Sequence, residues 1–125
     1  MKVALLVNPR AGLGGAVGLK GSDGPEVQQE AIARRGQARG ASRVAIFLQY
    51  LCAPGGDGAD SFLAPSAQPI TWVTWGAGMG ADSLRTLGFD YVRLGTPGAP
   101  TPAQDPIAAV HAWLGSNVDL IVLAG

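Results

Sequence analysis

The stretch that decides the fold is residues 3–24, which read VALLVNPRAGLGGAVGLKGSDG. It opens with a continuous apolar run, residues 3–7, which is too short for a signal-peptide core or a membrane span. A run of this length is typical of a strand that is buried on both faces of a parallel sheet, and we expect it to be an interior strand of that sheet. A glycine-rich segment, residues 8–24, follows at once. We therefore expect a loop directly at the carboxyl end of this strand.

Three further apolar runs of strand length occur along the chain, at residues 70–75, 91–94 and 119–124. Segments with helical spacing separate them, so strands and helices alternate. Alternation of this kind predicts crossover connections between parallel strands. The expected fold class is α/β: a three-layer, Rossmann-like parallel sheet with helices on both faces.

The clearest helical pattern follows Ser42, which is the expected N-cap. The apolar residues after it recur at the spacing of one helical face and are Val44, Phe47, Leu48 and Leu51. A weaker helical segment is expected over residues 26–35.

Two more helices are expected further along. Asp82 opens a short one, and Gly88 is the natural glycine at its end. For the last helix we favour Asp105 as the N-cap, followed by a proline at the first helical position, over a start at Thr101. Gly115 ends this helix.

The composition of the chain limits the classes of function that it can have. The chain has 125 residues, of which 47% are hydrophobic and 14% charged, and its formal net charge is zero. A neutral chain offers no electrostatic case for binding nucleic acid or an anionic membrane. One cysteine and one histidine exclude a disulfide framework and a Cys/His zinc site within the chain. These features favour a single domain in the reducing cytoplasm.

The glycine-rich loop is a candidate phosphate-binding loop, because glycines let backbone amides approach a phosphate closely. It fits neither of two familiar motifs. The dinucleotide fingerprint G-x-G-x-x-G meets Gly12 and Gly14 but has Val17 at its third glycine. A Walker A loop needs Ser or Thr after the lysine, whereas Gly21 follows Lys20. A flexible connector remains the alternative interpretation.

This loop resembles the start of the ATP-NAD kinase-like family, which shares a superfamily with NAD kinases and diacylglycerol-type lipid kinases. The resemblance rests on residues 8–12 (NPRAG), Gly14-Gly15 and residues 17–24 (VGLKGSDG). Weaker similarities follow at Phe47-Leu48, Gly78-Met79-Gly80, Thr101 with Asp105, and Asp119-Leu120-Ile121. Together they span nearly all of this chain but only the N-terminal domain of the family.

The resemblance implies an N-terminal α/β nucleotide-binding domain that a β-rich domain follows. It also implies that the first and last strands are neighbours, at the point where the strand order reverses. It implies transfer of the ATP γ-phosphoryl group to NAD, giving ADP and NADP, with Mg²⁺ neutralising the phosphates. The family's Gly-Gly-Asp-Gly-Thr motif would begin at Gly125, so we expect the aspartate used in phosphoryl transfer to lie beyond this chain. Residues 55–58 (GGDG) spell most of that motif, but they follow Pro54 and no strand, and we interpret them as a turn.

The candidate nucleotide- and phosphate-binding residues are Asn8, Gly12, Gly14, Gly15, Lys20, Asp23, Gly78, Gly80 and Gly125. Asn8 either ties down the loop or reaches a nucleotide. Lys20 and Asp23 contact phosphate and a ribose or metal-bound water, or are merely solvated. Gly78 and Gly80 form a second wall of the site or a tight strand-to-helix turn. No catalytic residue and no protein metal ligand is assigned within the chain.

Two other functions stay open at this point. In the first, the longer protein to which this domain would belong phosphorylates another small hydroxyl compound. In the second, that protein is an accessory protein that binds a nucleotide without turnover. In each case the expected partners are ATP and a small molecule. Self-association into a homo-oligomer is also expected, because the last strand would leave apolar surface uncovered.

Overall fold

Four parallel strands form one sheet in the computed structural model, which describes residues 1–19, 24–52, 69–98 and 104–125. The spatial order is β3-β2-β1-β4, with every neighbouring pair parallel. The strands are β1 (Lys2–Val7), β2 (Thr71–Trp75), β3 (Tyr91–Gly95) and β4 (Leu120–Ala124). This confirms the predicted α/β class and the interior position of the first strand.

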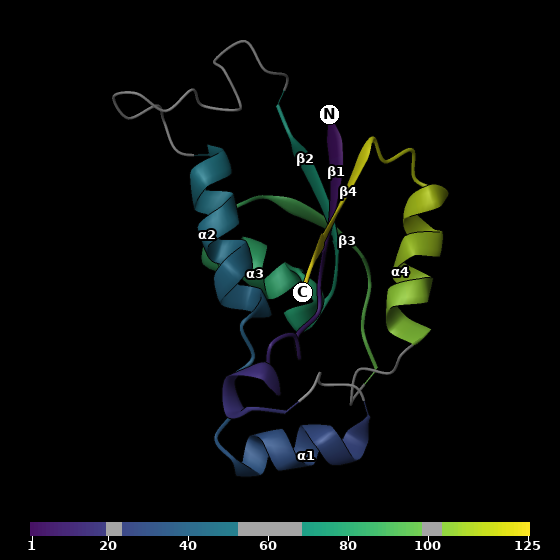
Figure 1. Ribbon diagram of the computed structural model, residues 1–125. Helices are drawn as coiled ribbons and strands as arrows, with labels where there is room; N and C mark the ends of the chain where they lie inside the picture. Colours follow the sequence, from purple (N-terminus) through teal and green to yellow (C-terminus); the bar gives the residue numbers. More distant parts are fainter. Residues whose placement is uncertain (20–23, 53–68, 99–103) are drawn as a thin grey trace.

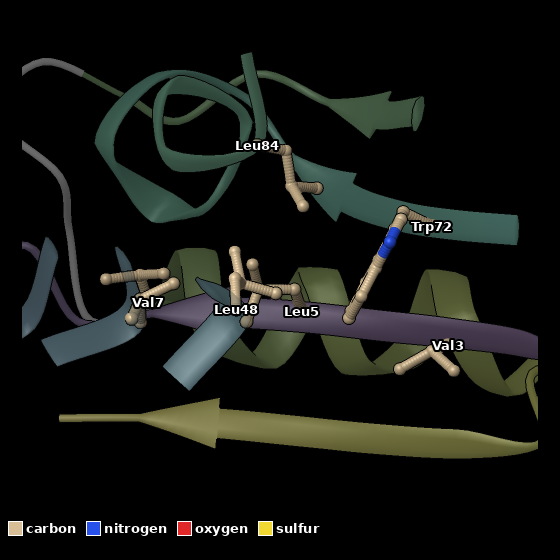
Figure 2. Close-up of a cluster of buried hydrophobic side chains, with 7 residues drawn as sticks. Val3, Leu5, Val7, Leu48, Trp72 and Leu84 are labelled. Atoms are coloured by element: carbon tan, nitrogen blue, oxygen red, sulfur yellow. The ribbon is translucent and has the colours of Figure 1, made fainter. Parts of the chain in front are cut away.

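The alternation of side chains along β1 builds an apolar cluster on each face of the sheet. Val3, Leu5 and Val7 point to one face, where Figure 2 shows them with Leu48 and Leu84. The helices on this face are α2 (Gly40–Cys52) and α3 (Ala81–Thr86).

On the opposite face, Ala4 and Leu6 of β1 pack with Ala109 and Trp113 of α4 (Gln104–Leu114). Figure 1 shows α2 and α3 on one side of the sheet and α4 on the other. The same figure shows α1 (Pro25–Ala33) lying past the carboxyl ends of the strands instead of against the sheet. The helix expected over 26–35 therefore exists, and it lies next to the edge where the loops gather.

The amino ends of β1 and β4 are fastened to each other. The Lys2 amide donates a hydrogen bond of 2.7 Å to the Asp119 carboxylate, and the Asp119 amide donates one of 2.9 Å to the Lys2 carbonyl. This reciprocal pair fixes where the two strands start, and the register Ala4 to Ile121 follows from there.

Two predicted helix starts differ from the structure, because the expected N-caps Ser42 and Asp105 both lie inside the first turn of their helices. Helix α2 begins at Gly40, and Ser42 lies inside its first turn with its hydroxyl donating to the Arg39 carbonyl at 3.0 Å. Gly40 is buried, and a Cβ there would lie 2.5 Å from the Asn8 carbonyl oxygen, so the start of α2 is set by close packing on the loop after β1.

Helix α4 begins at Gln104, which places Asp105 in its first turn. The Asp105 carboxylate accepts a hydrogen bond of 2.8 Å from the Gly98 amide, so it ties the preceding segment to the helix instead of capping it. Thr101 lies outside the described residues. The predicted helix end at Gly88 is confirmed, because this glycine follows α3 with φ +76°.

Two single turns of 3₁₀ helix, η1 (Gly15–Val17) and η2 (Ala77–Met79), complete the described structure. Within the described ranges, no helix has the length and apolar character needed to cross a membrane.

Candidate functional site

The direction of chain progression reverses between β1 and β4. From β1 the chain builds β2 and β3 outward on one side, and it then returns to place β4 on the other side of β1. The connection that follows β1 covers one face of the sheet with α2, whereas α4, which leads into β4, covers the other face. The carboxyl ends of β1 and β4 border a crevice between these connections. Ligands of open α/β sheets bind in such a crevice. The Asn8 amide marks its floor, donating a hydrogen bond of 2.7 Å to the Ala124 carbonyl.

A cleft of about 670 Å³ occupies this position, which we call the switch-point cleft. Its walls come from the end of β1 and the loop after it, the start of α1, η2, the first turn of α4 and the end of β4. The lining residues are Leu6, Val7, Asn8, Pro9, Arg10, Gly24, Pro25, Gln28, Met79, Pro106, Leu123, Ala124 and Gly125.

Asn8 lines this cleft and holds the loop in shape. Its side-chain oxygen accepts a hydrogen bond of 3.0 Å from the Arg10 amide, and its carbonyl accepts one of 3.2 Å from the Ala11 amide. Asparagine commonly closes a turn by bonding the backbone two residues ahead. Asn8 therefore ties down the loop, which is the first of the two roles that the sequence left open.

Arg10 is the cation of the cleft, and sequence reasoning did not single it out. It is half-buried, and its guanidinium donates a hydrogen bond to the side-chain oxygen of Gln28 on α1. Ion pairs within the described part of the chain join Arg34 to Glu30 and Arg85 to Asp82, and neither involves the cleft. The available signal was an arginine three residues after the end of a buried strand, where ligand-binding side chains gather.

The first glycines of the loop shape its path and do not line the cleft. Gly12 has φ +79°, and a Cβ there would lie 3.3 Å from the Arg39 Cβ. Gly14 is buried and precedes η1, whereas Gly15 faces open space. The Arg39 amide donates a hydrogen bond of 2.7 Å to the carbonyl of Ala11, which holds this half of the loop against the segment before α2.

The second glycine pair surrounds a residue that does line the cleft, Met79. A Cβ at Gly78 would lie 3.4 Å from the Pro9 Cβ, in ordinary contact. Gly80 has φ +144°, and a Cβ there would overlap the Thr74 hydroxyl. Packing therefore requires a glycine at position 80. Of the two alternatives that the sequence left open, this supports a tight strand-to-helix turn.

Of the predicted site residues, the structure thus brings Asn8 and Gly125 together in one cleft. Lys20 and Asp23 lie outside the described residues, as do residues 55–58. Among the residues that are described, there is no group of three or more His, Cys, Asp or Glu side chains that could hold a metal ion.

A second cleft, of about 450 Å³, lies between α2 and the amino-terminal half of β1 and β4. Its lining is apolar apart from one phenol and is formed by Met1, Val3, Phe47, Tyr50, Leu51, Ile70, Trp72, Leu120 and Val122. The described residues that line it carry no charged side chain, so the switch-point cleft is the better candidate site.

Comparison with protein-family models, with curated proteins and with solved structures gave no match to this chain.

Proposed function

We propose that the switch-point cleft binds a phosphorylated nucleotide. The observation that carries the proposal is the convergence of Asn8, Arg10 and Gly125 at the carboxyl ends of β1 and β4. Asn8 and Arg10 belong to the stretch that resembles the ATP-NAD kinase-like family, and Arg10 also supplies a positive charge. Gly125 stands where that resemblance would begin the Gly-Gly-Asp-Gly-Thr motif. On that basis we further propose that the chain is the N-terminal domain of an ATP-dependent NAD kinase-like phosphotransferase.

The cleft suits such a ligand in size and in chemistry. Its volume lies within the range of about 300–1,000 Å³ that is usual for small-molecule sites. Apolar side chains such as Leu6, Met79 and Leu123 line its walls, and these can contact the flat face of a base. The guanidinium of Arg10 can pair with a phosphate.

The proposed reaction moves the γ-phosphoryl group of ATP to the 2′-hydroxyl of the adenosine ribose of NAD. Such transfers depend mainly on alignment of the two oxygens and on neutralisation of the phosphate charge. Within this scheme Asn8 keeps the loop closed and Arg10 holds phosphate charge. The described residues include no group of three or more His, Cys, Asp or Glu side chains that could hold Mg²⁺.

Calorimetric titration of the chain with ATP tests the proposal. We expect saturable binding that weakens as salt is added, because charge pairing contributes to it. Leu123→Glu places a negative charge in the cleft and should weaken ATP binding by about tenfold or more. Leu114→Glu is the matched control, because Leu114 on α4 is 71% exposed, against 69% for Leu123, and lies outside the cleft.

No ATP binding at millimolar concentration would contradict the proposal. Equal weakening by both substitutions would also contradict it, because the site of binding would then lie elsewhere.

A further inference from the structure

Arg10 differs in its surroundings from the other arginines of the described chain. All of those are exposed, and two of them have carboxylate partners on their own helices. Arg10 is half-buried against apolar walls and bonds to the neutral oxygen of Gln28. A guanidinium that is partly removed from water needs a counter-charge to offset its lost hydration. Within the described residues no carboxylate supplies one.

Among the residues that the structure describes, the charged groups near the cleft leave that position to a ligand. Arg10 carries the one charged side chain among the described residues that line it. Asp105, next to the lining residue Pro106, is engaged by the Gly98 amide. Glu26 in the first turn of α1 is exposed and does not line the cleft.

We propose that Arg10 is the phosphate-binding residue of the switch-point cleft, an inference that rests on the proposed function. The planar guanidinium offers several N–H donors in a fixed fork, which matches two oxygens of one phosphate. Gln28 positions this fork from α1, because its side-chain oxygen accepts one of the guanidinium N–H groups. The fork has further N–H groups that can donate to a phosphate. The ligand class is therefore a nucleotide that places a phosphate at the start of α1 and its base on the apolar walls.

The first test compares Arg10→Gln with the wild type. ATP affinity should fall by about tenfold or more, because a charge-assisted pair is lost, whereas adenosine affinity should stay unchanged. Arg43→Gln is the matched control, since Arg43 on α2 is exposed and lies outside the cleft. Unfolding temperature, measured in parallel, reports whether the variants fold.

The second test uses Gln28→Glu, which keeps the shape of the side chain and gives Arg10 an internal counter-charge. ATP affinity should fall again, because the new carboxylate competes with the phosphate. Gln29→Glu is the control, because it makes the same charge change one residue further along α1, at an exposed position outside the cleft.

The outcomes separate this inference from the proposed function. If the wild type binds ATP and Arg10→Gln binds it equally well, the assignment of Arg10 is wrong while nucleotide binding stands. If Arg10→Gln weakens ATP and adenosine alike, Arg10 only shapes the cleft and the inference is also overturned. If the wild type binds no ATP, both the inference and the proposed function are wrong.

Discussion

At the scale of single residues, a buried hydrogen bond of Thr74 lies directly beneath Gly80, next to the switch-point cleft. Thr74 is fully buried in β2, and its hydroxyl donates a hydrogen bond of 2.9 Å to the Leu5 carbonyl of β1. Gly80 passes directly over this hydroxyl at φ +144°, a conformation that L side chains rarely adopt. Met79, the residue before Gly80, packs with Leu6 and Trp75 and lines the cleft.

Gly80→Ala should therefore destabilise the protein by about 2 kcal/mol or more, because the new methyl group overlaps Thr74 and the backbone is strained. Gly15→Ala should cost much less, since a Cβ there meets no atom within 4 Å and its φ is not in the positive range. Urea unfolding of both variants measures the difference. Equal costs would show that the packing at Gly80 is not the constraint described.

The sequence predicted the roles of some site residues but not of others. Asn8 was predicted as a site residue because it ends a buried strand, a position that the order of residues alone reveals. Arg10 was missed because its importance depends on Gln28, which lies 18 residues away on a helix whose position no local pattern predicts. Gly80 was predicted as a possible ligand wall, but its role follows from a contact with Thr74 that only the folded chain creates.

At the scale of elements, the two edges of the sheet differ. Edge strand β3 contains Arg93, and Pro97 follows it, features that discourage pairing with another strand. Edge strand β4 has only apolar residues, and Leu120 and Leu123 are 49% and 69% exposed. An apolar edge without charge or proline is open to another strand.

Self-association through β4 is the expected result, and sedimentation analysis of the chain measures it. Leu120→Lys should abolish or strongly reduce association, because it places a charge on this edge. Val92→Lys is the matched control, because Val92 is also 49% exposed but lies on β3. A chain that is monomeric at high concentration, or one that both substitutions affect equally, would contradict this expectation.

The strands were predictable from continuous apolar runs, whereas the starts of α2 and α4 were not. Ser42 and Asp105 are favourable capping residues, but they bond to the Arg39 carbonyl and the Gly98 amide respectively. Close packing of Gly40 on the loop after β1 set the start of α2 instead. Contacts between distant segments thus overrode local capping preferences.

At the scale of the whole molecule, the order of the strands creates the site. The crevice exists because β4 returns to the far side of β1, and α1 lies beneath the carboxyl ends of the strands (Figure 1). The sequence predicted this adjacency of the first and last strands through the family resemblance. The position of α1, which brings Gln28 to Arg10, had no such signal.

The central claim is that the switch-point cleft binds a nucleotide, and a titration of the ¹⁵N-labelled chain with ATP, followed by NMR, tests it most directly. The account predicts saturable shifts of backbone amides concentrated at Asn8, Arg10, Met79 and Gly125, with little change at Phe47 and Tyr50 beside the second cleft. Shifts that cluster around Phe47 and Tyr50, or a spectrum that ATP leaves unchanged, would contradict it.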